Sequence, residues 1–358
     1  MSATLRVCVV ELNHFHTEVF PVYAQYLPDL MHAPVEIDYF VIPRKLDELR
    51  PVHGSRVHPV YRAGLYRIAS KTGLRTFYFK RCVDAIVAEH RPDVLVFNSA
   101  EPKRVYAAFK HAKVAVKVGV VHVYGQVDLV KSPGEHYFVL GPNVYEHHRP
   151  QGVLDGYFLP FFRPYPLSPP ERPRGVLIGI QGNIDYRRRD YPGLLELAQT
   201  LLRQGGAGIR FNIIGGARHR DAVRLRQAIR VRGLESMFVL HDELNDADFF
   251  QQVVACDFLM PLLGPEHSRY YRFMITATLS HASAYGIPLV LARDNALAWG
   301  LDDAQAIAYE SYDELARMML RGEITQRRGE VLAAFVQGVN GRVQENRRVL
   351  RELRPAAS

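Results

Sequence analysis

The chain has 358 residues, 48% of them hydrophobic, and a formal net charge of +8 from 45 Lys and Arg against 37 Asp and Glu. This length suits two domains of ordinary size, and the apolar content allows each domain to bury a core. No apolar run approaches the ~20 residues of a membrane span, and no signal-peptide pattern occurs, so we expect a cytoplasmic protein. Cys8, Cys82 and Cys256 lie far apart in sequence and indicate neither a disulfide framework nor a metal site.

The basic excess is concentrated between residues 44 and 81, where ten Lys and Arg residues are opposed only by Asp47 and Glu48. Three interpretations are open: a solvated surface, attraction to an anionic membrane at the inner face, and nucleic-acid binding. No zinc-finger spacing, RNA-binding motif or recognition helix accompanies the charge, so no nucleic-acid partner is expected. A peripheral membrane association of the N-terminal half remains the functional alternative.

The first half of the chain alternates short apolar runs with amphipathic stretches, which predicts an α/β sheet. A polar turn at 13–16 separates the first strand from a helix with apolar residues on one side. Strands are predicted at 5–11, 35–42, 94–97, 114–121 and 137–140, and helices near 65–70, 77–89 and 104–111.

A connector follows at 161–175, FFRPYPLSPPERPRG, whose five prolines exclude a helix. We therefore predict an N-terminal domain at 1–165, a C-terminal domain at 166–328, and a helical segment at 329–358 that packs back on the first domain.

The second half repeats the strand-then-helix pattern from residue 175 onward, which favours a parallel sheet with helices on both faces. Apolar residues recur at helical spacing between 330 and 353 and predict one helix, or two helices broken at Gly338 or Gly341. After the first strand, strands are predicted at 211–214, 238–240, 258–261, 289–292 and 306–309, with helices from Asp190, at 218–230, near 245, at 276–285 and at 312–321.

Three segments of the second half carry short motifs, namely GIQGN at 179–183, ACDFLMPL at 255–262 and AYGIPLVLA at 284–292. These motifs resemble those of the family 4 glycosyltransferases, which bind nucleotide sugars and have the GT-B fold. The resemblance covers nearly the whole chain. It implies two Rossmann-like α/β/α domains facing a cleft, followed by C-terminal helices, with a nucleoside diphosphate sugar as donor substrate and no further cofactor.

Two places offer the fixed donors that a diphosphate needs, namely a glycine turn and a helix start. Gly182 and Asn183 lead into an arginine run, and Thr276 and Thr278 open a later helix. Arginine binds phosphate oxygens bidentately. The alternative is a glycine that only turns the chain and an arginine run that is solvated. Further candidates follow the next strand ends, where a carboxylate could hold sugar hydroxyls. The predicted donor-binding residues are Gly182, Asn183, Arg188, Arg189, Gly216, Arg218, Glu266, Tyr270, Thr276 and Thr278.

One feature departs from the family pattern. The family carries two glutamates, separated by seven residues, before its Gly-Pro turn, and alignment on Gly286 puts Phe273 and His281 in their places. The resemblance therefore implies a divergent member whose stereochemical outcome is open.

The N-terminal half is expected to face the acceptor, and ionisable residues follow three of its strands. His16 lies after the first strand, Glu101 after 94–97 and His122 after 114–121. A histidine can take a proton from a sugar hydroxyl near neutral pH, and a carboxylate can orient it. We therefore predict catalytic roles for these three residues, against the alternative of structural hydrogen bonding.

No metal site is predicted. Asp246 and Asp248 have an Asp-x-Asp spacing, but they stand at a helix start, where acids cap N–H groups. The sequence thus predicts a metal-independent glycosyltransferase of the hexosyltransferase type, acting on a glycan or lipid-linked acceptor in surface polysaccharide synthesis. The alternatives are a catalytically silent partner of the same fold, a sugar-nucleotide epimerase, and a nucleic-acid-modifying relative.

Overall fold

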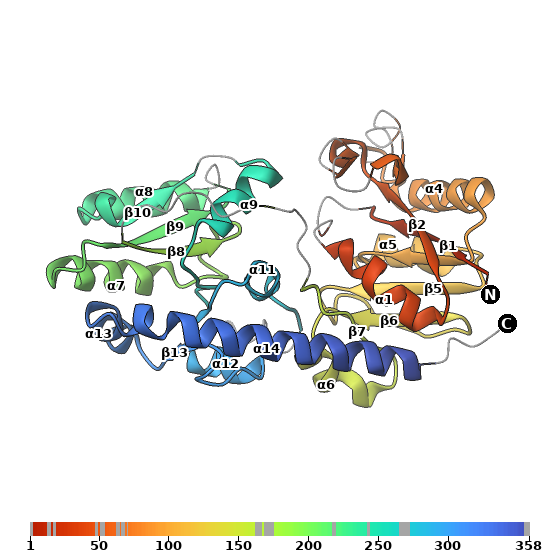
Figure 1. The fold of residues 1–358 in the computed structure, drawn as a ribbon. Helices are drawn as coiled ribbons and strands as arrows, with labels where there is room; N and C mark the ends of the chain where they lie inside the picture. Colours follow the sequence, from red (N-terminus) through yellow and green to blue (C-terminus); the bar gives the residue numbers. More distant parts are fainter. Residues whose placement is uncertain are drawn as a thin grey trace. The chain divides into compact units, whose positions relative to one another are not determined.

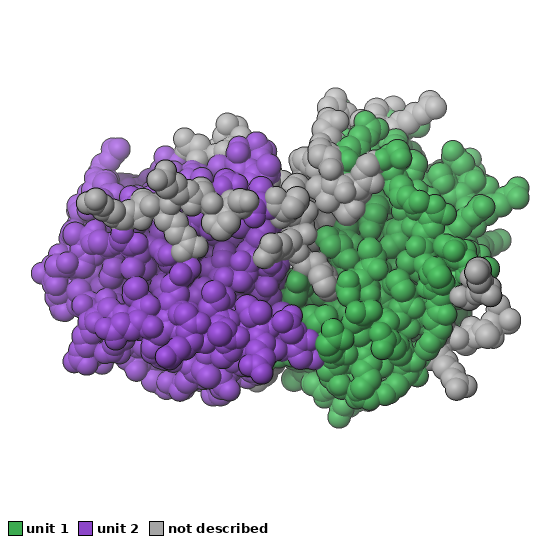
Figure 2. All heavy atoms as spheres, in the orientation of Figure 1, with its two compact units in different colours: residues 1–164, 272–275, 342–358 green, residues 165–271, 276–341 purple. Residues whose placement is uncertain are grey.

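The protein forms two compact units, shown in different colours in Figure 2. Unit 1 comprises Met1–Pro164, Arg272–Ile275 and Arg342–Ser358, and unit 2 comprises Tyr165–Tyr271 and Thr276–Gly341. Neither unit is continuous in sequence, unlike the two predicted domains. The computed structural model describes residues 3–12, 16, 19–46, 49–50, 54–61, 65, 69, 71–161, 167, 175–216, 220–241, 244–264 and 273–353.

Unit 1 is built on a parallel sheet of seven strands in the order β3-β2-β1-β4-β5-β6-β7. Its central strands are apolar along their length because helices cover both faces of such a sheet. All four residues of β4, for example, are buried. The strands are β1 (Leu5–Val10), β2 (Val35–Val41), β3 (Val57–Pro59), β4 (Val94–Phe97), β5 (Val116–Val121), β6 (Glu135–Val139) and β7 (Gly156–Tyr157).

Two layers of helices cover this sheet. Helices α4 (Arg75–His90) and α5 (Lys103–His111) share one core cluster with the strands. On α1 (Pro21–Met31), Tyr26 stacks on Phe158, whose ring also stacks on Phe138 of β6. Shorter helices are α6 (Pro142–His148), η2 (Pro43–Lys45), η3 (Gly54–Arg56) and η4 (Arg149–Gln151).

The last turns of α14 (Glu323–Glu352) also belong to unit 1. Asn346 is fully buried, donates from Nδ2 to the carbonyl of Tyr157 at 2.8 Å, and accepts from the N–H of Leu159 at 3.3 Å. Arg347 and Arg351 both bond to Asp29 of α1, at 2.5 and 2.8 Å. These contacts fix the end of the helix to unit 1.

Unit 2 carries a second parallel sheet in the order β10-β9-β8-β11, and a parallel bridge from Leu259 to Leu289 links it to the pair β12-β13. The helices follow the strands in alternation, as Figure 1 shows. The elements are β8 (Val176–Gln181), α7 (Tyr191–Arg203), β9 (Ile209–Ile214), α8 (Arg220–Val231), η5 (Glu235–Met237), β10 (Phe238–Leu240), α9 (Asp246–Val254), β11 (Phe258–Leu259), α11 (Ala277–Tyr285), β12 (Val290–Ala292), α12 (Arg293–Ala298), β13 (Ile307–Tyr309) and α13 (Tyr312–Leu320).

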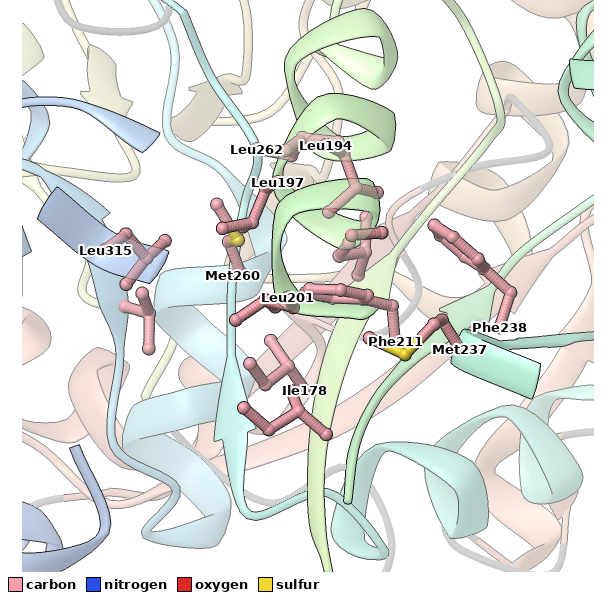
Figure 3. Packing of buried hydrophobic residues seen from close by; sticks show 14 of the residues in the cluster. Ile178, Leu194, Leu197, Leu201, Phe211, Met237, Phe238, Met260, Leu262 and Leu315 are labelled. Atoms are coloured by element: carbon pink, nitrogen blue, oxygen red, sulfur yellow. The ribbon is translucent and has the colours of Figure 1, made fainter. Parts of the chain in front are cut away.

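One face of α7 fills the core of unit 2. Leu194, Leu197 and Leu201 follow one another at helical spacing and point toward the sheet residues Ile178 and Phe211 (Figure 3). All of these side chains are at least 99% buried. Asp190 begins the helix by accepting a hydrogen bond from the N–H of Gly193.

The predicted α/β class is confirmed in both units, and the long elements lie close to their predicted ranges. The alternative of a broken C-terminal helix is wrong, because α14 continues through Gly338 and Gly341. It does so because a buried stripe at Val331, Phe335 and Val339 holds it against unit 2. No sequence pattern predicted β3, β7, α6 and α12, and most of the predicted helix at 65–70 lies outside the described residues.

Candidate active site

In unit 1 the strand order reverses between β1 and β4, and ligands of doubly wound sheets bind beyond the strand ends at such a point. Glu11 follows β1, and Asn98 and Ser99 follow β4. The Oε2 atom of Glu11 accepts from Asn98 Nδ2 and from Ser99 Oγ, both at 2.6 Å. A carboxylate and an amide, neither exposed to solvent, therefore occupy the reversal point.

Asn98 connects this carboxylate to two histidines. Its Oδ1 accepts from the Tyr23 hydroxyl at 2.5 Å, and its Nδ2 also donates to the carbonyl of His16 at 3.0 Å. The backbone carbonyl of Asn98 lies 2.5 Å from Nε2 of His122. Since a carbonyl only accepts, His122 must carry a hydrogen on Nε2.

The rings of His16 and His122 are stacked, with centroids 3.8 Å apart and planes 23° apart. His16 has φ of 70°, the left-handed region that non-glycine residues rarely adopt. Residues held in such conformations concentrate at functional sites. Two residues predicted from separate strand ends are thus in direct contact.

Glu101 is the third predicted catalytic residue, and it joins the same cluster. Its Oε1 accepts from the N–H groups of His122 at 2.9 Å and Val123 at 3.2 Å. Burial raises its pKa to about 7, although these N–H groups and His16 act in the opposite direction. A carboxyl with such a pKa can give or accept a proton near neutral pH. We refer to Glu11, Asn98, Glu101, His16 and His122 as the switch-point cluster.

In unit 2 the strand order reverses between β8 and β11. Gly182 follows β8 with φ of 99°, and its carbonyl packs against Gly215, which follows β9. A Cβ on Gly215 would lie 2.0 Å from that carbonyl oxygen, whereas a Cβ on Gly216 would lie 3.6 Å from Oδ1 of Asn183. Two glycine loops therefore meet backbone to backbone at the carboxyl edge of the sheet.

The arginine run after Gly182 divides into two roles. Arg189 donates from its guanidinium to the carbonyls of Gln181 and Asn183, so it bridges the two residues that flank Gly182 and clasps this loop from one side. Arg187 bonds Asp185 at 3.1 Å, and Nε of Arg188 lies 3.5 Å from the same carboxylate. Hydrogen bonds from Arg187 are the largest cause of a lowered pKa at Asp185. The side chains of Arg187 and Arg188 are 85% and 59% exposed.

The predicted helix start at Thr276 is present. Thr276 caps α11 by accepting from the N–H of Thr278, and both threonines are buried. Nδ1 of His281 on the same helix lies 3.1 Å from Oε1 of Gln181 at the end of β8. This hydrogen bond ties α11 to the strand that ends at the Gly182 loop.

Three predicted donor-binding residues, Arg218, Glu266 and Tyr270, lie outside the described residues. Phe273, which stands where the family has its first glutamate, belongs to unit 1. Its ring lies 5.2 Å from that of His148, and its carbonyl accepts from the N–H of Tyr124 at 2.9 Å. In this chain the position supports the loop after His122 by packing.

Three residues of the site were not predicted from the sequence, namely Glu11, Asn98 and Gln181, although each ends or follows a strand just as the predicted residues do. The N-cap residue of α9 is Asn245, whose side chain accepts from the N–H of Asp248 at 2.8 Å. Within the described ranges, no group of three or more His, Cys, Asp or Glu side chains has the arrangement of a metal site.

No protein-family model and no curated protein sequence matches the chain. Its fold is similar to that of a glycosyltransferase from Rickettsia africae, with a TM-score of 0.60 and 13% identity, over 98% of this chain and 99% of that one. A putative UDP-N-acetylglucosamine 2-epimerase from Listeria monocytogenes has a TM-score of 0.53 and 11% identity, over 92% and 91%.

An S. aureus TarM mutant, crystallised with fondaparinux, α-GlcNAc-glycerol and UDP, has a TM-score of 0.53 and 12% identity, over 78% of this chain and 58% of that one. Identities this low speak for the fold alone. The chain has the GT-B fold, with two Rossmann-like α/β units.

Proposed function

We propose that the protein is a glycosyltransferase that moves a sugar from a nucleoside diphosphate sugar to a hydroxyl of a glycan or lipid-linked acceptor. The observation that carries this proposal is the switch-point cluster, which gathers two histidines and a carboxyl with a pKa near 7 in a unit of the GT-B fold. Deprotonation of a hydroxyl nucleophile needs such a group. Similarity to glycosyltransferases of the same fold supports the reaction class.

Unit 2 is proposed to hold the donor. Backbone N–H groups of rigid glycine loops suit a diphosphate because they need little ordering on binding. The exposed Arg188 adjoins the Gly182 loop, and Thr276 starts α11, which is tied to the same strand. These groups would stabilise the charge that grows on the leaving diphosphate in the transition state. Arg189 would keep the loop in shape by clasping its carbonyls.

Unit 1 is proposed to activate the acceptor. With Nε2 donating to Asn98, His122 would take up a proton at Nδ1. Glu101 accepts a hydrogen bond from the backbone N–H of His122, and Asn98 donates one to the backbone carbonyl of His16. These backbone hydrogen bonds fix the positions of both histidines and leave their rings to face the substrate. We further propose that the enzyme needs no divalent metal, works in the cytoplasm, and serves surface glycan or glycoconjugate synthesis.

The test is thermal stabilisation of the full chain by UDP, GDP, dTDP, ADP and CMP, with and without Mg²⁺. A ligand that binds only the native state must raise its stability. We expect one diphosphate to stabilise the protein, and Arg188→Ala and Thr276→Ala to reduce that shift. The matched controls are Arg203→Ala and Thr200→Ala, which lie in the last turn of α7, at the end of that helix that is far from the Gly182 loop. Both should respond like the unmodified chain. No response to any nucleotide would refute the donor site.

A second candidate is a sugar-nucleotide epimerase, which the fold similarity to the Listeria protein favours. An epimerase would convert a free UDP-sugar to its epimer without an acceptor, whereas a transferase would leave it unchanged or hydrolyse it slowly. Analysis of the sugar after incubation with the donor alone distinguishes the two. Donor binding without either reaction would point to a catalytically silent partner.

A further inference from the structure

Two large apolar side chains are exposed at the start of α4. Leu74 and Phe77 are 56% and 63% exposed. Single exposed apolar residues are ordinary on protein surfaces, but neighbouring ones mark an interaction surface. Leu74 and Phe77 lie within one helical turn of each other.

The same segment is basic and free of acids. Between residues 71 and 83 the sequence KTGLRTFYFKRCV contains four basic residues and no Asp or Glu. The next acid, Asp84, already bonds His111 at 3.0 Å. Lys71, Lys80 and Arg81 have no carboxylate within ion-pair distance among the described residues. We call Lys71, Leu74, Arg75, Phe77, Lys80 and Arg81 the α4 patch.

Packing of α4 explains why Phe77 and Arg81 face outward, whereas Arg75 and Lys80 are only partly exposed. Phe79, Cys82, Val83 and Ile86 are buried in the core cluster that α4 shares with the sheet. Phe77 and Arg81 are four residues apart, which places them on one side of the helix, and both are exposed. Apolar and basic side chains therefore project together from the surface of unit 1.

The patch lies at the same edge of the sheet as the switch-point cluster. Tyr78, in the first turn of α4, has its ring 5.9 Å from that of Tyr61, which follows the carboxyl end of β3. The helix then runs back along the sheet (Figure 1), and its last residue, His90, precedes β4 by a short turn. The carboxyl ends of β1 and β4 carry the switch-point cluster.

We propose that the α4 patch docks unit 1 on an anionic lipid bilayer. Basic side chains are attracted to anionic headgroups, and exposed leucine and phenylalanine side chains enter the boundary between headgroups and acyl chains. Neither interaction suffices by itself for stable binding, and the patch supplies both. A nucleic acid fits less well, since Leu74 gains nothing from a phosphate backbone and cannot stack on bases.

Docking at this edge also indicates where the acceptor resides, an extension that rests on the proposed function. An acceptor carried by a lipid would reach the switch-point cluster from the bilayer to which the same edge is bound. The class of acceptor inferred is therefore a lipid-linked saccharide or glycolipid rather than a free sugar.

The experiment is co-sedimentation of the full chain with phosphatidylcholine vesicles that contain about one third phosphatidylglycerol, compared with pure phosphatidylcholine. We expect binding only to the anionic vesicles, weakened by salt. Lys80→Gln combined with Arg81→Gln should lower the partition coefficient about 30-fold, the factor that two basic residues contribute near an anionic surface. Leu74→Gln combined with Phe77→Gln should lower it by about 10-fold or more.

The matched control is Arg230→Gln combined with Arg232→Gln, which removes the same charge from exposed positions of unit 2. Val231→Gln, at a side chain 78% exposed, controls for the loss of apolar surface. Thermal unfolding of each variant checks that it folds. Equal losses in patch and control variants, no binding to anionic vesicles, or tighter binding to tRNA than to vesicles would overturn the proposal. None of these readouts depends on donor binding, so a failure here is distinguishable from a failure of the proposed function.

Discussion

Replacement of Gly215 by alanine tests whether the two glycine loops of unit 2 are held rigidly against each other. The new Cβ would lie 2.0 Å from the carbonyl oxygen of Gly182 and 2.6 Å from its carbon. Real Cβ contacts are essentially never shorter than 3.0 Å, so the loops must separate by about 1 Å. Neither atom belongs to a flexible side chain, and Arg189 clasps the Gly182 loop from the other side. The strain cannot be relieved by a rotamer change.

Overpacking of this kind costs about 1–3 kcal/mol. For a unit of this size, about 2 kcal/mol lowers the unfolding temperature by roughly 4–8 °C. The assay is thermal unfolding of the full chain, followed by the same scan in the presence of the nucleotide that stabilises the unmodified chain most. We expect Gly215→Ala to unfold earlier and to lose most of its nucleotide response, because the N–H groups of both loops are displaced.

The neighbouring substitution Gly216→Ala is the control for stability. Its Cβ would make an ordinary contact of 3.6 Å with Oδ1 of Asn183, so the free energy of unfolding should change little. If Gly215→Ala proved as stable as Gly216→Ala, the loops would separate with no loss in the free energy of unfolding. That result would refute the inference that they are held rigidly together.

Three further predictions concern unit 1. Because burial raises the pKa of Glu101 to about 7 from an ordinary value of 4.5, the native state binds this proton more tightly than the unfolded state, and stability falls as pH rises between these values. Denaturant unfolding should give a free energy of unfolding that is lower at pH 8 than at pH 5 by up to about 3 kcal/mol. Glu101→Gln should abolish this difference. An unchanged pH dependence in the variant would contradict the assignment of the difference to Glu101. Asn98→Asp should destabilise the protein by about 1–3 kcal/mol, since it replaces the donor to Glu11 with a second carboxylate. The control Asn143→Asp, on α6, should leave the stability unchanged. Equal unfolding midpoints for the two variants would exclude Asn98 as the residue that organises the switch-point cluster. Desolvation acts to raise the pKa of Asp29, but hydrogen bonds from Arg347 and Arg351 outweigh it and leave the pKa lowered, so this carboxylate stabilises the fold above its ordinary pKa and the contribution is lost in acid. Asp29→Asn should therefore speed amide exchange in the last turns of α14 at pH 7, and exchange rates identical to those of the unmodified chain would contradict this.

The fold was largely predictable because the central strands are buried on both faces. Continuous apolar runs such as VLVF in β4 identify strands without knowledge of their neighbours. The strands β3 and β7 span only three and two residues and carry no such run. They form because the edge of an existing sheet offers them hydrogen bonds, which a local pattern does not reveal.

The candidate site was predictable in part for a related reason. Polar residues at strand ends point to the carboxyl edge of a parallel sheet, and this rule identified His16, Glu101 and His122. Their mutual contact depends on β4 lying between β1 and β5, which is a property of strand order. The role of Asn98 depends on hydrogen bonds to residues far away in sequence, and that of Arg189 on backbone carbonyls. Neither leaves a signature in residue type.

The attachment of α14 has a consequence for synthesis on the ribosome. Unit 1 is completed by residues 342–353, which follow the whole of unit 2 in the chain. Until they are translated, the backbone N–H of Leu159 and the carbonyl of Tyr157 lack Asn346, and Asp29 lacks both of its arginines. The nascent N-terminal half therefore lacks these hydrogen bonds and ion pairs while unit 2 is made. Part of the stabilisation of the first half is supplied by a helix that is translated after unit 2.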